Sequence, residues 1–490
     1  MFCGLLIFAS APVVVGQAQN ASGFSQAPAQ TQQSETSSSE NAGTSPTTSS
    51  STTSPFLNSV PEGKATGAVL PLSFKDALDR ALRNSLGLLL SSDNSLAVRG
   101  EKWQELSKLL PNVSASATQA AQQIDLAALG FRFNFPGISP VVGPIGTFDA
   151  RVYVTAPLFD WHETERERGA RANEAASRYS YKNARELVVL ATGNEYLLTI
   201  SAGARVDAAQ AQVETAQALY NKAHDQQVAG VSPSIDVLRA QVELQTRQQQ
   251  LIVARNGYAR QKLALARTIG LPPGQEFNLT DQEPYQPLTP LNLEDALRRA
   301  YASRADYQAA VQQVLSAEQF RRAATAEHLP ILEFSGNYGA AGVNIGNSHG
   351  VFLAGGTLEI PIFAGGRSRA DALQAEATLR QSRQQLENLR AQIDYDVRTA
   401  LLDLTAASDQ VQVAKSSLDL ANQTLVQARD RFTAGVTDNL EVIEAQDTLA
   451  SANENYISSL YAHNVAKVSL ARAIGFAEQG VRQYLENKGK

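Results

Sequence analysis

The chain has 490 residues, a formal net charge of −6 at pH 7 and a single cysteine, Cys3. The acidic balance disfavours a nucleic-acid-binding surface, so we expect no nucleic acid partner. The lack of cysteine beyond position 3 excludes disulfides and thiolate chemistry in the rest of the chain, and it suits an exported protein.

The first residues have the pattern of a targeting segment. Residues 4–15 form an apolar run that is too short for a transmembrane helix and has the length of a signal-peptide core. We therefore expect residues 1–18 to be a signal peptide. Residues 19–66 are rich in Ser, Thr and Gln and poor in large apolar side chains, which predicts a disordered linker.

The remaining sequence is duplicated. Residues 72–78 (Leu-Ser-Phe-Lys-Asp-Ala-Leu) return as Leu-Asn-Leu-Glu-Asp-Ala-Leu at 291–297, 219 positions later. Ser73 and Asn292 are good N-cap residues for the helices that follow. We divide the chain accordingly into a first repeat over 67–289 and a second over 290–490.

A Leu-Pro pair in each repeat marks a change of period from 3.6 to 2. The alternation predicts outgoing strands at about 111–120 and 331–339 and returning strands at about 149–158 and 351–361. Segments of about 10 alternating residues have the length of a tilted membrane-spanning strand. An ordinary β-hairpin on a soluble domain remains an alternative interpretation. We expect the connecting segments 121–148 and 340–350 to be loops.

Each returning strand ends in a Pro-x-Phe motif, at Pro157 and at Pro361. Proline lacks the donor that a strand ladder needs, so these residues predict the junctions between strand and helix. Gly365 and Gly366 follow the second motif. No P-loop Lys-Ser/Thr pair follows these glycines, which favours a junction over a phosphate-binding loop.

Two proline-free segments, 161–228 and 367–434, predict helices that would each extend roughly 100 Å. A turn follows each helix, with tips at 229–234 and 434–439, and then another helix of about 40 residues. The apolar positions are mostly Ala, Leu and Val at heptad-like spacing, which is typical of long antiparallel coiled coils.

The two turns have the same Ala-Gly-Val sequence, 205 positions apart. Glycine accepts the left-handed backbone that ends a helix, so both turns predict hairpin tips. The residues of this motif are Ala229, Gly230, Val231, Ala434, Gly435 and Val436.

Catalytic and metal-binding motifs are missing from the sequence. The five histidines are scattered without an HExxH pattern, and neither a Gly-x-Ser-x-Gly motif nor a nucleotide loop occurs. We therefore predict no enzyme activity, no metal and no cofactor. Glu441 and Glu444 lie three positions apart on one helix face, a pattern that on its own indicates solvated surface.

These motifs, in doubled order and near-constant spacing over roughly residues 70–478, resemble the TolC-like outer membrane efflux proteins. Four strands with open edges cannot cross a lipid bilayer, because each unpaired backbone group there costs several kcal/mol. Three chains would give twelve strands and room for a channel. The resemblance likewise implies a fold that is mainly α with a small β part. It implies a homotrimer with a 12-stranded barrel in outer-membrane lipid and a periplasmic helical tunnel.

The resemblance further implies a function in tripartite efflux or type I secretion. The chain would be an exit duct for substrates delivered by an inner-membrane transporter and a periplasmic adaptor (a membrane fusion protein). The Ala-Gly-Val tips would contact the adaptor, and Glu441 and Glu444 would narrow the periplasmic gate, with Thr437 at the family's latch arginine position. Two alternatives are a periplasmic coiled-coil adaptor and a structural protein without a membrane barrel.

Overall fold

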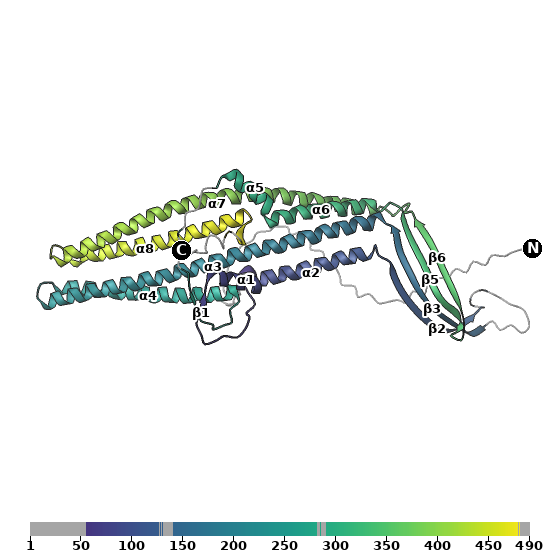
Figure 1. Ribbon diagram of the computed structural model, residues 1–490, viewed down its shortest axis with the longest axis horizontal. Helices are drawn as coiled ribbons and strands as arrows, with labels where there is room; N and C mark the ends of the chain where they lie inside the picture. Colours follow the sequence, from purple (N-terminus) through teal and green to yellow (C-terminus); the bar gives the residue numbers. More distant parts are fainter. Residues whose placement is uncertain are drawn as a thin grey trace, which may run out of the picture. The chain divides into compact units, whose positions relative to one another are not determined.

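The computed structural model describes residues 55–126, 128, 130, 141–281, 285, 291–478 and 480. In this part the chain is mainly helical, with one long four-stranded sheet (Figure 1). The expectation of a mainly α fold with a small β part is confirmed. The expected signal peptide, 1–18, lies outside the described residues.

The helices of the described residues follow the duplication. The first repeat contains α1 (Phe74–Asn84), α2 (Leu86–Ser107), α3 (Trp161–Val228) and α4 (Ser234–Ile269); the second contains α5 (Leu293–Ser303), α6 (Ala305–Ala326), α7 (Arg367–Thr433) and α8 (Asn439–Ala473). The Ser73 side chain accepts from the Asp76 amide and that of Asn292 from the Glu294 amide, so both predicted N-caps are confirmed. Because α3 packs against α6 and α8, the two repeats form one folded unit.

The main sheet joins the repeats. Its strands are β2 (Asn112–Asp125), β3 (Val141–Phe159), β5 (Ile331–Asn344) and β6 (Asn347–Glu359), all antiparallel in the order β2-β3-β5-β6. The pairing of β3 with β5 connects the first repeat to the second, and β2 and β6 form the two edges. Each strand exceeds the 9–11 residues that a tilted membrane span needs.

The expected loop at 340–350 is wrong, because β5 and β6 continue through most of it. Ala and Gly at 340–342 pair with residues 348–350 and leave a tight turn at Ile345-Gly346. The side chain of Asn344 accepts from the Asn347 amide at 2.8 Å, which supplies the turn chemistry. The expected loop at 121–148 is likewise shortened from both ends by β2 and β3.

The expected linker boundary at residue 66 is also wrong. The segment after the short 3-10 helix η1 (Pro55–Leu57) is tied to the first repeat by backbone hydrogen bonds, Val60 N to Asn84 O at 2.8 Å and Glu62 N to Gly270 O at 3.2 Å. Phe56 packs against the main core. One aromatic anchor and these bonds order a segment whose composition alone indicates disorder.

A short parallel pair, β1 (Leu70–Leu72) with β4 (Phe277–Leu279), was not expected from the sequence. The pair lies beside a core cluster that includes Phe74, Tyr196 and Val468.

Within the described residues, α3 is the one helix with a stretch apolar enough to cross a bilayer, and half of that stretch is buried in the protein. We interpret α3 as a packed core helix.

Each repeat closes at an Ile-Gly pair, and these two glycines are sterically required. Both have φ of +71°, and an added Cβ at Gly270 would lie 2.8 Å from the Cβ of Asn84. At Gly475 it would lie 2.6 Å from the backbone nitrogen of Arg304. The end of each returning helix therefore packs directly on the junction of the repeat's first two helices.

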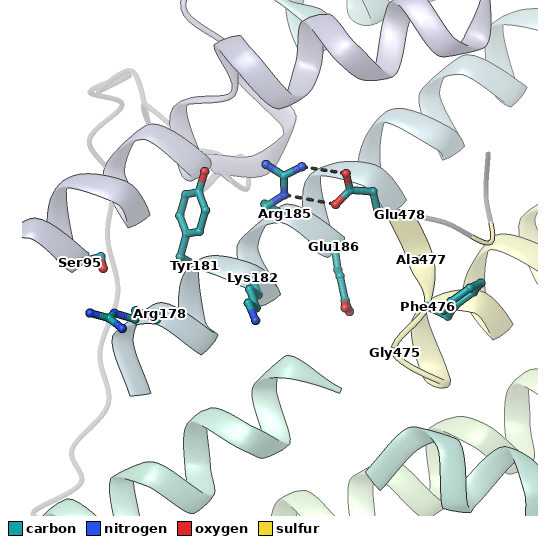
Figure 2. Close-up of a pocket in the computed structure, with 10 residues that line it drawn as sticks. All are labelled: Ser95, Arg178, Tyr181, Lys182, Arg185, Glu186, Gly475, Phe476, Ala477 and Glu478. Carbon is teal, nitrogen blue, oxygen red and sulfur yellow. Dashed lines mark hydrogen bonds and ion pairs between the residues drawn. The ribbon is translucent and has the colours of Figure 1, made fainter. Parts of the chain in front are cut away.

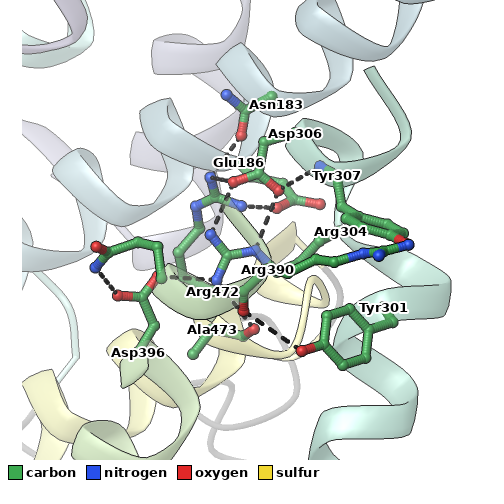
Figure 3. A network of polar contacts seen from close by, with 11 residues as sticks. Asn183, Glu186, Tyr301, Arg304, Asp306, Tyr307, Arg390, Asp396, Arg472 and Ala473 are labelled. Atoms are coloured by element: carbon green, nitrogen blue, oxygen red, sulfur yellow. Dashed lines mark hydrogen bonds and ion pairs between the residues drawn. The ribbon is translucent and has the colours of Figure 1, made fainter. Parts of the chain in front are cut away.

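A buried polar network connects the repeats near the junction of α5 and α6 (Figure 3). Arg304 is 6% exposed and donates to Asp306 at 2.7 Å and to Asp396 of α7 at 3.0 Å. Arg472 of α8 donates to Glu186 of α3 at 2.6 Å. The network thus joins α3, α6, α7 and α8.

The environment of this network shifts the pKa values of two carboxyl groups in opposite directions. Burial raises the pKa of Asp306, but the bonds and charge of Arg304 outweigh burial and hold the pKa below its ordinary value. For Glu186, burial outweighs the opposing effect of Arg472 and raises the pKa. Arg304 is therefore the main group that lowers the pKa of Asp306.

The last described segment of the second repeat also contacts α3. Arg185 donates to Glu478 at 2.8 and 3.2 Å. Figure 2 shows this pair at the edge of a cleft that Tyr181, Lys182 and Phe476 also line. The pair links the segment that follows α8 to the first repeat.

We predict that Arg304→Met lowers the free energy of unfolding by about 3 kcal/mol, because it leaves two carboxylates without their buried partner. Arg298 is the matched control, since it is 77% exposed and pairs with Asp295 within α5. Arg298→Met should cost less than about 1 kcal/mol. Heat or urea denaturation of the detergent-purified protein measures both, and equal losses would contradict a structural role for the network.

Candidate functional site

The two hairpin tips have the same backbone construction. In the first, Ala229 N donates to Asp225 O at 3.0 Å and Val231 N to Gln226 O at 2.9 Å. In the second, Ala434 N and Val436 N make the equivalent bonds to Asp430 O at 2.9 Å and Arg431 O at 3.0 Å. The central glycines, Gly230 and Gly435, both have φ of +71°, as the repeated motif predicts.

The tips present apolar side chains to solvent. Val231 is 77% exposed and Val436 is 69% exposed, and Val228, Ile235 and Leu440 beside them are also exposed. Exposed apolar groups gathered at the end of a long hairpin are characteristic of a surface that another protein covers.

The two tips are joined to each other in one chain. A core cluster of Leu219, Ala223, Val237, Ala240, Leu425, Ala428, Phe432, Val442 and Ala445 connects the hairpins. The Asn439 side chain donates to the backbone oxygen of Asp236 at 2.7 Å, and Arg239 lies 3.7 Å from Asp438. Figure 1 shows the two hairpins running side by side to this end.

Arg247 makes the most buried charged contact near the tips. It is 4% exposed and donates to Glu243 of its own helix at 2.5 Å. It also donates to Asp447 of α8 and to Gln250 of α4 at 3.0 Å. Arg247 therefore ties α4 of the first hairpin to α8 of the second.

The sequence carried a signal for Arg247 that composition alone does not reveal. The buried positions Ala240, Leu244 and Leu251 of α4 have heptad spacing, and Arg247 occupies the place in this series where an apolar residue is expected. An arginine in a coiled-coil seam needs a buried partner, and Glu243 is one turn away.

Glu441 and Glu444 lie in the first turns of α8. Glu441 pairs with Arg431 of its own hairpin at 3.5 Å, and Glu444 is exposed. Their neighbours Val442 and Ala445 are buried in the tip cluster, so the two carboxylates lie off the packed side of the helix. Both carboxylates can therefore face a space outside this chain.

The predicted junction residues are placed as follows. Pro157 lies inside β3, which continues to Phe159, so the junction expected there is two residues too early. The register shifts between Pro157 and Phe159, and such an irregularity accommodates the missing donor. Pro361 follows the end of β6, and Gly365 and Gly366, with φ of +61° and +87°, lead into α7.

The sheet has two chemically different faces. The cross-strand register places an apolar set on one face: Val113, Ala115, Ala117, Phe148, Ala150, Val152, Val154, Phe334, Tyr338, Phe352, Ala354 and Leu358. The other face carries every charged side chain of β3, β5 and β6: Asp149, Arg151, Glu333 and Glu359. Phe352 and Tyr338 are largely exposed, so the apolar face has no cover within the described chain. A face of this kind suits lipid.

Among the described residues, no three side chains of His, Cys, Asp and Glu come together as a possible metal site. The predictions that the protein lacks a metal, a cofactor and enzyme activity stay predictions.

The sequence matches the model of a protein family described as outer membrane efflux protein, over residues 79–271 and 296–476. Similar proteins include outer membrane protein TolC of Escherichia coli K12, 23% identical over 314 residues, 60% of this chain and 63% of TolC. The match therefore spans less than two thirds of TolC. The alkaline protease secretion protein AprF of Pseudomonas aeruginosa is 21% identical over 434 residues, 84% of this chain and 88% of AprF.

Several solved structures have the same fold as this chain. The outer membrane protein VceC of Vibrio cholerae has a TM-score of 0.70 at 18% identity, covering 82% of this chain and 96% of VceC. The open state of the Neisseria gonorrhoeae outer membrane channel MtrE has a TM-score of 0.70 at 18% identity, covering 86% and 95%. The long helical hairpins and four-stranded sheet are thus an arrangement already observed in outer membrane proteins.

We predict that Arg247→Met loosens the joined tips, because it leaves Glu243 buried without its partner. The local opening free energy of α4 and α8 near the tips should fall by about 2–3 kcal/mol. Hydrogen exchange of the full chain measures this. Arg205 is the control, since its pair with Glu454 is more exposed. Arg205→Met should change the local opening free energy by less than about 1 kcal/mol. Unchanged exchange in Arg247→Met would contradict the tie.

Proposed function

Because this chain belongs to the outer membrane efflux protein family, we propose that it is the outer-membrane exit duct of a tripartite efflux or type I secretion system. The observation that carries the proposal is a two-faced sheet continued by two hairpins whose long helices, α3 and α7, each span roughly 100 Å. The apolar face contacts outer-membrane lipid, the charged face lines a water-filled lumen, and the helices form a periplasmic tunnel.

The duct is a homotrimer. The sheet of one chain has two unpaired edges, β2 and β6, and lipid provides no donors or acceptors for them. Two chains would give eight strands, a barrel whose interior side chains fill. Three chains give twelve strands, which leave room for a channel.

The hairpin tips meet a periplasmic adaptor, which links the duct to an inner-membrane transporter. Val231 and Val436 offer the exposed apolar contacts, and the small residues Ala229, Gly230, Ala434 and Gly435 allow partner helices to approach closely. Among similar proteins, the name AprF refers to protease secretion and that of CusC to cation efflux. The duct is a passive path, so the transporter that feeds it decides which substrates enter it.

The periplasmic entrance is the place where the duct is gated. Three copies of Glu441 and Glu444 set six carboxylates around one narrow opening. Thr437 stands at the position of the family's latch arginine, and Arg431 pairs with Glu441 inside one hairpin at 3.5 Å. Within one chain, the ion pairs of Arg247 with Asp447 and of Arg239 with Asp438 connect the two hairpins and hold the tips together.

Tags inserted at two turns test this topology. A tag at Ile345-Gly346, the turn between β5 and β6, should be labelled on intact cells, because that turn faces the outside. A tag in either Ala-Gly-Val tip should be labelled only after the outer membrane is opened. The reverse pattern would contradict the proposed orientation, and labelling of both turns on intact cells would contradict a periplasmic tunnel.

We predict that replacing both Glu441 and Glu444 with Ala weakens block of single-channel conductance by polyvalent cations at least about tenfold, because the carboxylate ring is removed. Assembly should be unchanged, since both side chains lie outside the tip cluster. Glu454→Ala, an acidic residue farther along α8, is the control and should keep the block. If the double variant is blocked as strongly as the original protein, these residues are ordinary surface charge.

A further inference from the structure

The inner face of the sheet carries a single basic residue. Arg151 is the only Lys or Arg on β2, β3, β5 and β6, all of whose residues the structure describes. The same face carries Asp149, Glu333 and Glu359. This inference rests on the proposed barrel, in which that face lines the lumen.

The Arg151 side chain is held on this face of the sheet by contacts with neighbouring side chains. Its Nε donates to Asp149 Oδ1 at 2.7 Å, its Nη2 contacts the other carboxylate oxygen, and its Nη1 reaches Asn337 Oδ1 at 3.5 Å. Asp149 lies on β3 with Arg151, and Asn337 lies on β5. Both members of the ion pair remain about one-third exposed, so the guanidinium is positioned and still meets the lumen.

The neighbouring strand lies close to β3 at Arg151. Gly339 of β5 is directly opposite Arg151, and an added Cβ there would lie 2.6 Å from the Arg151 Cα and 2.8 Å from its Cγ. The nearest atom to that Cβ is the Ala150 backbone oxygen, so a side chain at position 339 would disturb the pairing of β3 with β5. The glycine therefore allows the close strand pairing that positions Arg151.

We propose that Arg151 determines the charge preference of the barrel, by keeping this band of an otherwise acidic lumen permeable to anionic solutes. In the trimer three guanidinium groups offset three Asp149 carboxylates at one level. Without Arg151, Asp149 would add a ring of negative charge to those of Glu333 and Glu359. The arginine is thus a specificity-determining residue of the duct wall.

Single cysteines can measure the local potential, because Cys3 is the only native cysteine and can be replaced by Ser. Ser116 of β2 is directly opposite Arg151 on the inner face. In Ser116→Cys, the probe is the ratio of the reaction rates of an anionic and a cationic methanethiosulfonate reagent, measured on the trimer in lipid vesicles. The tunnel entrance is the same in all variants, so a change of this ratio between variants reports the local potential.

We expect Arg151→Gln, added to Ser116→Cys, to lower the anionic-to-cationic rate ratio of the new thiol about fivefold to tenfold, since one charge within several Å is lost. Asp149→Asn should raise the ratio, and Arg151→Lys, which keeps the charge, should stay near the original value. Asn112→Cys lies on the same face about 13 Å along β2, beyond the screening length, and its ratio should change little.

The control for the barrel itself is Ala115→Cys, on the apolar face. If the thiol of Ala115→Cys reacts freely while that of Ser116→Cys is protected, the assignment of faces is wrong and the proposed duct fails. If the thiol at position 116 reacts and the one at 115 is protected, but neither Arg151→Gln nor Asp149→Asn moves the ratio, the duct stands and the role of Arg151 is overturned. Protection at position 115 together with opposite shifts in the two charge variants supports the proposal.

Discussion

The architecture depends on one constraint: backbone groups at a sheet edge cannot be left unpaired in lipid. One chain supplies four strands, one apolar face and two open edges, β2 and β6. The apolar face can meet the membrane only if these edges find partners in other copies of the chain. In the proposed duct, barrel closure and the lumen follow from this requirement, and the room needed for a channel favours three chains.

The helical part solves a different problem, which is to hold two long hairpins together without a large globular core. Much of the seam is alanine, so packing alone gives little specificity of position. Buried ionic contacts supply the missing fixed points. The Arg304 network does so at the junction of the helices, and Arg247 does so near the tips. The Arg304 network reaches the first repeat through Arg472 and Glu186, and Arg247 reaches the second repeat through Asp447. Movement of one hairpin against its neighbour must therefore disturb charged pairs as well as apolar packing.

Much of this fold could be predicted because the determining signals are local and doubled. The Ala-Gly-Val tips, the N-caps Ser73 and Asn292 and the long helices all lie where the repeated motifs indicate. The turn at Ile345-Gly346 was missed because Ala and Gly at 340–342 look like a loop in sequence, although small residues also suit close strand pairing. Arg304 was missed because arginine is ordinarily a surface residue and its partner Asp396 is distant in sequence. Arg247 was missed for the first of these reasons, although its place in the heptad series of α4 and Glu243 one turn away were local signals. The β1–β4 pair is too short and too distant in sequence to have a periodic signal.

Closure by three chains is tested most directly by electron cryomicroscopy of the full chain purified in detergent. The expected particle has three-fold symmetry, with twelve strands in one ring and β2 of each chain beside β6 of the next. The helical hairpins should continue from that ring as a tunnel of roughly 100 Å. A single chain, a ring closed by two chains, or a sheet whose apolar face is covered by protein would contradict the account.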